Sequence, residues 1–344
     1  MSTPVLDLFA GPGGWDQGAR DAGLDLDITG VELDPHACAT ARATGHTRIQ
    51  ADAHTLDLAD WAHARGLIAS PPCPTWSAAG RRSALADLDR VLDTMTGIGW
   101  WEPGPDGEPA AWAPVAWTDV AAEVGECQDP RTGLFAIAAW AALRLPALDW
   151  VVMEQVPAAA PLFEDIAVEL ASIGWSADTH VVDAAALGMP VRRRRVYLVA
   201  WRPGWNGAHP DLQTPIPGPS TMAAALGWPA GHRVITRGNR RGGGGNAFSA
   251  DEPSWALTGS ARSWARDDGH RLTITEASRL HGFPDDYPWA GSRTRRFLQV
   301  ADVVLPPIAA RILTAVARPQ PGAYLPPTPD YGRGAGAQLA LPVA

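Results

Sequence analysis

The sequence predicts an α/β protein in which a parallel sheet is covered by helices on both faces, followed by a smaller, irregular region. Three observations support this prediction. Apolar, strand-like runs alternate with helical segments along residues 3–201. Hydrophobic residues make up 46% of the 344 residues and charged residues 19%, which allows a sizeable core and excludes a mainly disordered chain. From residue 202 to about residue 270, a composition rich in Gly, Pro, Arg and Trp replaces the helical period.

The strand-like runs are short, apolar and bounded by turn residues, as expected of buried strands. The expected strands are Thr3–Phe9, Leu26–Leu33, Arg48–Ala51, Gly66–Ser70, Trp150–Glu154, an extended stretch at His180–Val182, and Arg195–Trp201. Helices are expected over Trp15–Gly23, from Pro35 onward, over Gly133–Leu145 and over Leu162–Gly174. Because parallel sheets bind ligands at the carboxyl ends of their strands, the residues that end these runs are the first candidates for a site.

Composition and cysteine pattern narrow the class of protein. The most apolar stretch, residues 135–153, is interrupted by charged residues and a proline too soon for a membrane span. The N-terminus lacks the basic-then-apolar pattern of a secretory signal. Cys38, Cys73 and Cys127 are widely spaced and odd in number, which argues against a disulfide framework or a CxxC metal site. We therefore expect a soluble protein of a reducing compartment, with no metal and no membrane partner.

Charge is unevenly distributed along the chain. The formal net charge is −9 and the pI is near 5.4, which by themselves argue against a polyanionic partner. Residues 192–311, however, hold 17 arginines against 9 acidic residues. Because phosphate contacts are local, this basic half outweighs the total charge and predicts a polyanionic partner.

The same shifts in composition divide the chain into segments. Residues 1–201 form the main domain, with an acidic insertion at 83–128 that holds four of the sixteen tryptophans. Residues 202–270 form a second, smaller domain or an elaborate loop system, and residues 271–318 follow it. The Pro/Gly/Ala-rich tail at 319–344 is expected to be disordered or loosely packed.

A glycine-rich turn, AGPGG, follows the first strand and opens the first helix. Small residues let a backbone approach a ligand closely, although about half of such turns are mere connections. Glu32 ends the second strand, where an acid can accept both hydroxyls of a ribose, and Asp52 follows the third, where it can receive the amine of adenine. Each acid alone is more often a solvated carboxylate. The glycine-rich turn and the two acids, at successive strand ends, together indicate an adenosine-containing cofactor. Since the Walker pattern and the full GxGxxG are missing, S-adenosylmethionine is favoured over NAD or ATP.

Cys73 lies just past a strand, in SPPCPTWS. Most free cysteines are small buried hydrophobes. Here prolines on both sides remove backbone donors and argue against a packing role. A nucleophilic role requires a thiolate, and hence an electropositive site or a nearby base.

Two further features lie at the same predicted edge. Glu154 ends the strand expected beside that of Cys73, and either faces solvent at the rim or lines the site. Residues 192–195 are four arginines that precede the last strand, a run whose plain interpretation is a solvated, phosphate-binding face. Strand alternation places Arg193 and Arg195 on one side together.

These motifs, in this order, resemble the DNA cytosine-5 methyltransferase family of the bacterial or phage type. DLFAGPGG at 7–14 is similar to its first motif, SPPCPTWS at 70–77 to its Pro-Cys loop, MEQV at 153–156 to Glu-Asn-Val, and PVRRRRVYLV at 190–199 to its Gln-x-Arg-x-Arg strand. DPRTGLF at 129–135, LTITEASRLHGFPD at 272–285 and the stretch at 299–308 resemble its later motifs. The ordered set covers most of residues 3–316 and is far more specific than any single motif.

The resemblance implies a Rossmann-like class I methyltransferase sheet with helices on both faces, S-adenosylmethionine as cofactor and double-stranded DNA as partner. Residues 1–201 would be the catalytic and cofactor-binding domain, 202–270 a smaller, irregular target-recognition domain, and 271–318 the late motifs that return to the catalytic domain. A cytoplasmic enzyme of a bacterial cell or phage-infected host is expected.

The roles of the site residues are likewise implied by the resemblance. Cys73 would add as a thiolate to C6 of a flipped-out cytosine, and Glu154 would hold a proton at N3. Arg195 would bind O2, and Arg193 would support the loop and a phosphate. The implied cofactor residues are Phe9 on the adenine, Gly11, Gly13 and Gly14 against the amino-acid part, Glu32 on the ribose, Leu33 on the adenine's other face, Asp52 on its amine, and Pro72.

This chain departs from the family pattern at four places. They are Pro74 for the Gln after the nucleophile, Gln155 for the Asn of Glu-Asn-Val, Val191 for the Gln before the arginines, and Ala301-Asp302 for a closing Gly-Asn. The last change puts a carboxylate near the amino-acid end of the cofactor unless an Arg or a water intervenes, which leaves a modified S-adenosylmethionine open. Because Cys73, Glu154 and both arginines of the implied catalytic set are present, we predict that the protein is a catalytically active methyltransferase.

Target recognition is assigned to Arg202–His270. Arg233, Arg237, Arg240 and Arg241 flank a tetraglycine and are the predicted DNA-binding residues, because arginines read guanine edges or clamp phosphates. A flexible loop is the slightly commoner use of such glycines. For the insertion at 83–128 we expect folding away from DNA or docking of a protein partner, and for the chain as a whole a monomer.

Two other functions stay open at this point. A non-catalytic DNA-binding homologue agrees with Asp302 but not with the intact catalytic set. An enzyme that applies the same chemistry to tRNA would recognise shape and single-stranded loops instead of a groove, and the recognition-sized segment before Leu272 favours DNA. An NAD-dependent oxidoreductase lacks any hydride-transfer constellation. The target sequence does not follow from the residues.

Overall fold

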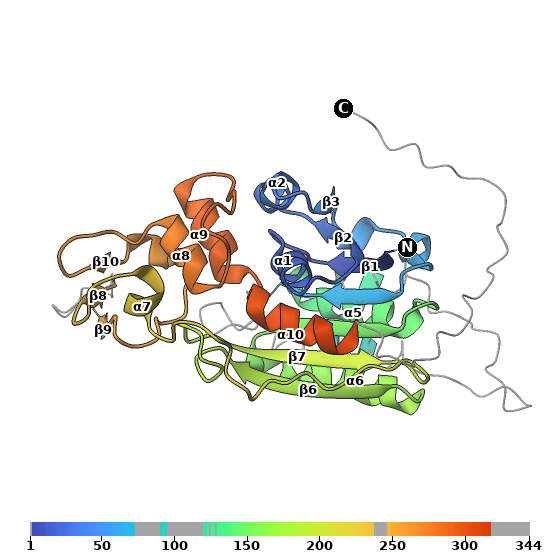
Figure 1. Ribbon diagram of the computed structural model, residues 1–344. Coiled ribbons are helices and arrows are strands. Elements are labelled where there is room, and N and C mark those ends of the chain that lie inside the picture. Colours follow the sequence, from blue (N-terminus) through green and yellow to red (C-terminus); the bar gives the residue numbers. More distant parts are fainter. Residues whose placement is uncertain are drawn as a thin grey trace, which may run out of the picture.

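The computed structural model describes residues 2–72, 129–236 and 246–317, together with residues 90–91, 93–94, 120, 122–123 and 125–127 (Figure 1). The predictions for Cys73, Arg237, Arg240 and Arg241 fall outside these residues. So do the predictions for most of the insertion at 83–128 and for the tail at 319–344.

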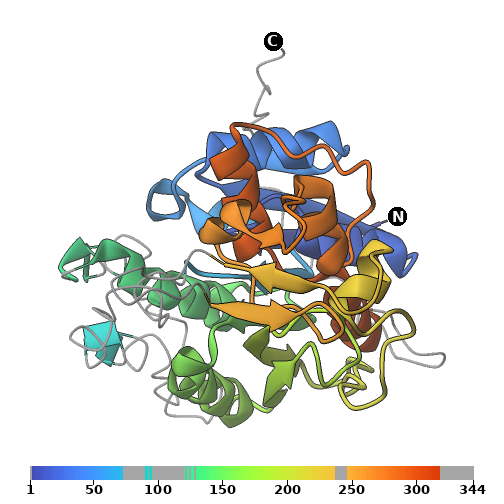
Figure 2. The same cartoon turned by 90° about the vertical axis from the view of Figure 1, so that its left-hand side faces the viewer.

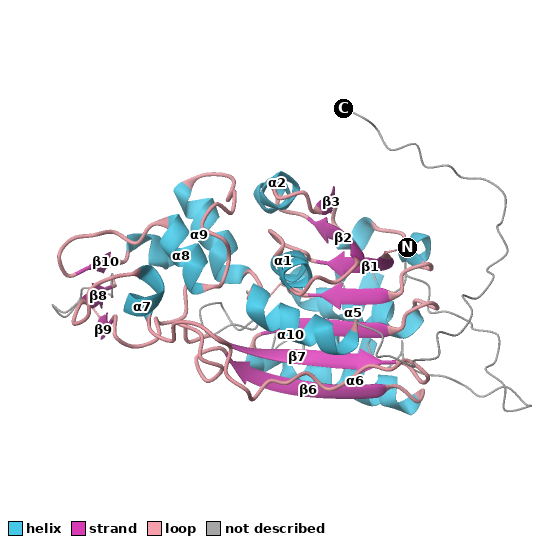
Figure 3. Cartoon of the chain, viewed as in Figure 1, coloured by secondary structure: helices cyan, strands magenta, loops and turns pink. Residues whose placement is uncertain are grey.

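The main body is a seven-stranded sheet in the order β3-β2-β1-β4-β5-β7-β6 (Figure 3). Its strands are β1 (Thr3–Leu8), β2 (Leu26–Glu32), β3 (Thr47–Gln50), β4 (Gly66–Ala69), β5 (Trp150–Gln155), β6 (Ser176–Asp183) and β7 (Arg194–Trp201). The pairs from β3 through β5 are parallel. The strand order reverses between β1 and β4, and ligands of such sheets bind outside the carboxyl ends at that point.

Strand β7 corrects the prediction of a parallel sheet. It lies between β5 and β6 and pairs antiparallel with both. Residues 184–193, which join β6 to β7, are too few for the crossover of a dozen or more residues that a parallel neighbour requires. The chain therefore turns back on itself, and the first residues of β7 arrive at the edge where β5 ends.

Helices cover both faces of the main sheet, which confirms the layered architecture (Figure 3). They are α1 (Gly14–Asp21), α2 (Pro35–Ala43), α5 (Pro130–Arg144), α6 (Ala160–Ser172) and α10 (Pro306–Val316), with short 3-10 turns η1 (Ala53–Thr55), η2 (Leu58–Trp61) and η3 (Pro157–Ala159). One core joins the sheet to α5 and α6 around Phe135 and Phe163. The other joins it to α1 and α10 around Trp15 and Ile312. Each predicted strand and helix is present, and the stretch at His180–Val182 belongs to the longer β6.

Two helices begin at an Asp-Pro pair. The side chain of Asp34 accepts the N–H of His36 at 2.8 Å, and that of Asp129 accepts the N–H of Arg131 at 3.1 Å. Each cap satisfies a backbone donor that the first helical turn leaves free, and proline suits the next position. The cap of α2 also fixes Asp34 directly after β2, at the ligand edge of the sheet.

A second sheet of three short strands, in the order β10-β8-β9, lies apart from the main one (Figure 1) and faces the viewer in Figure 2. Its elements are β8 (Arg233–Ile235), β9 (Ala247–Ser249) and β10 (Ala265–Arg266), with α7 (Met222–Leu226), η5 (Gly259–Ser263), α8 (Ile274–Leu280) and α9 (Arg293–Asp302) around it. These elements share a third core that includes Phe248, Trp264, Phe283 and Phe297. That core contains residues from both sides of the boundary predicted at residue 270.

Helices α9 and α10 follow each other so closely that Arg293–Val316 is long and apolar enough, by length and composition, to cross a membrane. Within the described residues, 67% of its most apolar window is buried inside the protein. Burial of this kind is typical of a core helix, and α10 indeed packs against α1 and the sheet.

A cluster of buried charges lies beneath the glycine-rich turn. The guanidinium of Arg48 donates to both carboxyl oxygens of Asp16, at 3.0 and 2.6 Å, and to the carbonyl of Gly11 at 3.2 Å. A Cβ on Gly30 would lie 2.4 Å from a guanidinium nitrogen of Arg48, so glycine at that position leaves room for the Arg48 side chain. Asp7 is fully buried nearby, and neither of its carboxyl oxygens has a hydrogen-bond partner among the described residues.

Burial, reinforced by Asp16, raises the pKa of Asp7 well above its ordinary value. The folded protein therefore keeps a proton on Asp7 to a higher pH than the unfolded chain does. The contribution of this group to stability is complete below the unfolded-chain pKa of about 3.9 and is lost as the pH rises through the folded-state pKa.

We predict that Asp7→Asn raises the thermal unfolding midpoint at neutral pH and reduces the loss of stability between acid and neutral pH. Asp16→Asn is the matched control, because it neutralises a buried carboxylate that is paired with Arg48, and it should cost about 3 kcal/mol. Thermal unfolding monitored by circular dichroism at several pH values measures both. Equal destabilisation by the two substitutions would contradict the assignment of an uncharged Asp7.

Candidate active site

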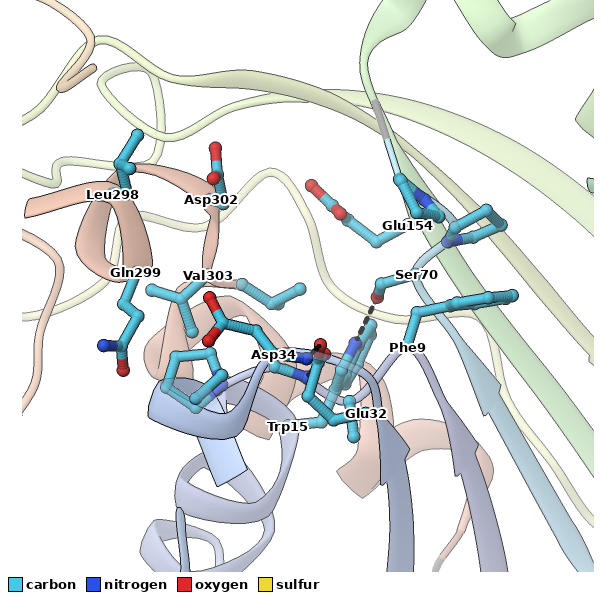
Figure 4. A pocket seen from close by; sticks show the side chains of 18 of the residues that line it. Phe9, Trp15, Glu32, Asp34, Ser70, Glu154, Leu298, Gln299, Asp302 and Val303 are labelled. Carbon is cyan, nitrogen blue, oxygen red and sulfur yellow. Dashed lines mark hydrogen bonds between the residues drawn. The ribbon is translucent and has the colours of Figure 1, made fainter. Parts of the chain in front are cut away.

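A pocket of about 300 Å³ lies where the carboxyl ends of β1, β2, β4 and β5 meet the segment between α9 and α10 (Figure 4). This is the expected position for a ligand of such a sheet, and the volume is at the lower end for a small-molecule site. Seven of the residues predicted for the site line it, namely Phe9, Gly11, Gly14, Glu32, Pro72, Glu154 and Arg195.

The turn after β1 shapes one wall. Phe9 has a φ of 61° and Gly11 a φ of 56°, so the chain leaves the strand through left-handed backbone at both residues. Phe9 is not a glycine, and a side chain in this conformation is strained, as is common where a ligand is held. The strained turn presents the aromatic ring of Phe9 to the pocket (Figure 4).

Glu32 is fixed from both sides by backbone donors. One carboxyl oxygen accepts the N–H of Gly11 at 2.8 Å, and the other accepts that of Asp34 at 2.7 Å. An ionised carboxylate has about four lone-pair positions, so each oxygen still has one to offer to a ligand. Glu32 can therefore accept hydrogen bonds from two adjacent hydroxyl groups of a ligand, one at each carboxyl oxygen.

The two glycines that begin α1 have different surroundings. A Cβ on Gly14 would lie 2.3 Å from the carbonyl oxygen of Val304, so this glycine allows the segment after α9 to close against the turn. A Cβ on Gly13 would instead meet His46 and Tyr287, at 2.7 and 2.8 Å. Gly13 does not line the pocket, and its smallness serves packing behind the turn.

Two hydrogen bonds hold the segment that leads to Cys73. The indole N–H of Trp15 donates to the hydroxyl of Ser70 at 3.0 Å, and the side-chain amide of Gln155 donates to the carbonyl of Pro71 at 2.6 Å. The amide oxygen of Gln155 in turn accepts the N–H of Val156 at 2.6 Å. Gln155 thus ties the end of β5 to the residues that precede Cys73.

Glu154 meets both predicted arginines. A carboxyl oxygen of this buried residue lies 2.8 Å from Nε of Arg195 and 4.0 Å from an Nη of Arg193. Arg193 is buried and Arg195 is half-buried, whereas Arg192 and Arg194 are exposed, as strand alternation predicts. An acid and a partly accessible cation therefore face the pocket together, with a second cation behind them.

Arg193 does not line the pocket but joins its two walls. Its guanidinium donates to the carbonyls of Ala301 and Asp302, at 2.5 and 3.2 Å, while it lies beside Glu154. Burial, followed by the charge of Arg195, lowers the pKa of Arg193 to about 10, so the group stays charged at neutral pH. Neighbouring His281 is fully buried, and burial lowers its pKa well below the ordinary value, which keeps it neutral beside the two arginines.

Three other predicted residues lie away from the pocket. The side chain of Leu33 is 62% exposed. Asp52 caps η1 by accepting the N–H of His54 at 3.0 Å. Arg233 begins β8 in the small sheet, where it is exposed and donates to the carbonyl of Ala247 at 3.4 Å. The roles assigned to these three residues stay predictions.

Sequence reasoning also missed residues that line the pocket. They are Trp15, Asp34, Ser70, Arg295, Leu298 and Gln299, among others. Asp34 carried a signal, because an Asp-Pro pair after a strand predicts a capped helix at the ligand edge. Arg295 carried none, because only the packing of α9 brings it within 3.9 Å of Asp34.

Comparison with known proteins supports the family resemblance. Residues 3–94 match the family model described as C-5 cytosine-specific DNA methylase. Two curated relatives are similar to nearly the whole chain. Type II methyltransferase M.AplI of Arthrospira platensis is 26% identical, over 99% of this chain and 92% of the relative. Type II methyltransferase M1.HphI of Haemophilus parahaemolyticus is 25% identical, over 92% of this chain and 87% of the relative.

Solved structures share the fold of this chain. S. pombe Dnmt2 methyltransferase superposes with a TM-score of 0.63 at 15% identity, covering 91% of this chain and 98% of that one. Entamoeba histolytica methyltransferase EhMeth does so with a TM-score of 0.60 at 13% identity, covering 92% and 98%. At these identities the comparison supports the Rossmann-like fold and nothing finer.

The Gln155 amide yields a prediction specific to this chain. Gln155→Met keeps the volume but removes the bond to the Pro71 carbonyl, and an unsatisfied buried carbonyl costs about 1–3 kcal/mol. We expect a lower unfolding temperature and a changed rate of Cys73 alkylation by iodoacetamide, measured by peptide mass spectrometry. Buried Cys38 is the internal control in the same digest. An unchanged alkylation rate would show that Gln155 does not position the loop.

Proposed function

We propose that this protein methylates C5 of cytosine in double-stranded DNA, with S-adenosylmethionine as the methyl donor. The observation that carries the proposal is the ion pair of Glu154 with Arg195 at the pocket, across from the segment that leads through Pro72 into Cys73. The match to the cytosine-specific DNA methylase family model and the similarity to curated methyltransferases support the reaction type.

The pocket suits the proposed cofactor. Phe9 offers an aromatic face for adenine, Glu32 has lone pairs left for the two ribose hydroxyls, and Val303 and Val304 form an apolar wall. When bound, S-adenosylmethionine supplies an electrophilic methyl group. Leu33 and Asp52, which the resemblance implicates, would have to move or act through water to contribute.

The residues around the pocket would divide the work on cytosine. C5 of cytosine is a poor nucleophile, and addition of the Cys73 thiolate to C6 makes it carbanion-like. Glu154 would hold a proton at N3, so that charge does not build up on the ring. Arg195 would donate to O2, while Arg193 keeps Glu154 and the closing segment in place.

The sequence of bonds balances without any further reagent. A bond would form between the Cys73 sulfur and C6, and C5 would take up the methyl group as the donor's sulfur–methyl bond breaks, which leaves S-adenosylhomocysteine. Loss of the C5 proton to water would then restore the C5–C6 double bond and break the bond from sulfur to C6, which releases the thiolate. None of these atoms is accessible within a duplex, so the base must be flipped out at a cost of a few kcal/mol.

Mechanism-based trapping tests the proposal. In 5-fluorocytosine the hydrogen at C5 is replaced by fluorine, which a base cannot abstract. The elimination step is therefore blocked, and the Cys73 adduct should persist after methyl transfer. We expect a covalent complex with duplex DNA in the presence of S-adenosylmethionine, and its loss in Cys73→Ser. Glu154→Gln should slow adduct formation by about 10²–10⁴-fold, the usual contribution of general acid–base catalysis.

The same experiment separates the alternatives. Trapping of RNA but not DNA would replace the proposal with a tRNA enzyme. Binding of DNA without any adduct would indicate a non-catalytic homologue. Sequencing of the trapped duplexes, prepared with 5-fluorocytosine in random contexts, would also identify the target site.

DNA contact is assigned to the basic half of the chain. Arg233 lies on the small sheet, and Arg237, Arg240 and Arg241 follow it in sequence. Neutralising Arg240 and Arg241 together should weaken DNA binding at all sequences and flatten the slope of log Kd against log salt by about two units. Fluorescence anisotropy at several salt concentrations measures this slope, with an Arg131→Gln variant on α5 as control. An unchanged slope would place the DNA-binding face elsewhere.

A further inference from the structure

Asp302 presents a carboxyl group to the pocket that no described residue pairs with. It is the last residue of α9 and lines the pocket. Figure 4 shows its side chain and that of Glu154 extending into the same space. Within the described parts of the chain, its carboxyl forms no hydrogen bond or ion pair, although its backbone carbonyl accepts from Arg193.

Neighbouring contacts hold the backbone at Asp302 and leave its carboxyl unpaired. Arg193 uses its guanidinium on the carbonyls of Ala301 and Asp302 and on Glu154, and Arg195 is paired with Glu154. Desolvation by the pocket walls raises the pKa of Asp302, while the two arginines oppose that shift. The residue is exposed at the pocket, so its carboxyl is open to a ligand that supplies a donor or a positive charge.

The other acids of the pocket already have partners. Glu32 accepts two backbone N–H groups, Asp34 lies 3.9 Å from Arg295, and Glu154 is paired with Arg195. Asp302 is thus, among the described acids that line the pocket, the one whose carboxyl has neither a hydrogen-bond donor nor a cation as partner. In the family pattern this position is an asparagine, a neutral side chain that can both donate and accept, whereas an ionised aspartate only accepts.

We propose that Asp302 is the counter-ion of the sulfonium of S-adenosylmethionine, so that this pocket distinguishes the positively charged donor from its neutral-sulfur product, S-adenosylhomocysteine. The inference rests on the proposed function. It also favours ordinary S-adenosylmethionine over a modified form with an added carboxylate, which Asp302 would repel.

The position of Asp302 favours the sulfonium over the ammonium as its partner. Asp302 shares its space with Glu154, and Pro72, the residue before Cys73, lines the same pocket. In the proposed reaction the methyl group passes to the cytosine that Glu154 would hold, so the sulfur that carries it belongs at the Glu154 end of the pocket. A carboxylate there stabilises the bound donor more than the transition state, in which positive charge leaves the sulfur, and it weakens binding of the product.

Isothermal titration calorimetry without DNA tests the inference independently of catalysis. The variant is Asp302→Asn, which restores the family residue with little change in shape. We expect its Kd for S-adenosylmethionine to rise about tenfold, equivalent to about 1.4 kcal/mol, and its Kd for S-adenosylhomocysteine to change less than twofold or to fall. Sinefungin, which carries an amine in place of the sulfonium, should follow S-adenosylmethionine.

Two further variants keep the test decisive. Asp302→Glu retains the charge and should keep most of the preference for the donor, which excludes a simple packing effect. Asp34→Asn removes an acid of the same pocket that is paired with Arg295, and should change the affinity for donor and product by the same factor.

The possible failures are distinguishable. An equal change in affinity for donor and product in Asp302→Asn, or no change, would overturn the inference while leaving the proposed function intact. Wild-type protein that binds neither compound would instead remove the proposed function itself.

Discussion

The guanidinium of Arg48 is the interaction on which the ligand edge depends. It extends from β3 across Gly30 and donates to both carboxyl oxygens of Asp16 on α1. It also donates to the carbonyl of Gly11. A buried charge pair of this kind adds little net stability, but loss of one member is costly, so it fixes one geometry. The turn it holds places Gly11 N–H on Glu32 and the ring of Phe9 in the pocket.

Arg193 has the corresponding role at the opposite wall of the pocket. It bonds to the carbonyls at the end of α9 and lies beside Glu154, so the closing segment and this acid share one cation. The run of four arginines therefore contains two kinds of residue. Arg192 and Arg194 are exposed, with Arg192 paired to Glu252, whereas Arg193 and Arg195 contact Glu154.

Local patterns predicted the fold well because short apolar runs and Asp-Pro caps determine where strands and helices begin. The same patterns could not predict the direction of β7, which follows from the short link after β6, a matter of tertiary distance. Motifs predicted Glu32, Glu154 and Arg195 at one edge of the sheet, and all three line the pocket, since each ends or begins a strand there. Leu33, one residue beyond β2, is exposed, and its predicted contact with the cofactor stays a prediction. The pairing of Arg295 with Asp34 depends on packing between segments distant in sequence.

The shared core of the small sheet and helices α8 and α9 bears on how target specificity could be exchanged between relatives. Phe248 and Trp264 pack in the same interior as Phe283 and Phe297. A chimera joined near residue 270 would therefore split that interior and leave apolar surfaces without their partners. Junctions before Met222 and after Val303 would carry the whole unit across, together with the end of α9 that forms one wall of the pocket. A change of DNA sequence preference and a change of cofactor affinity would then be inherited together.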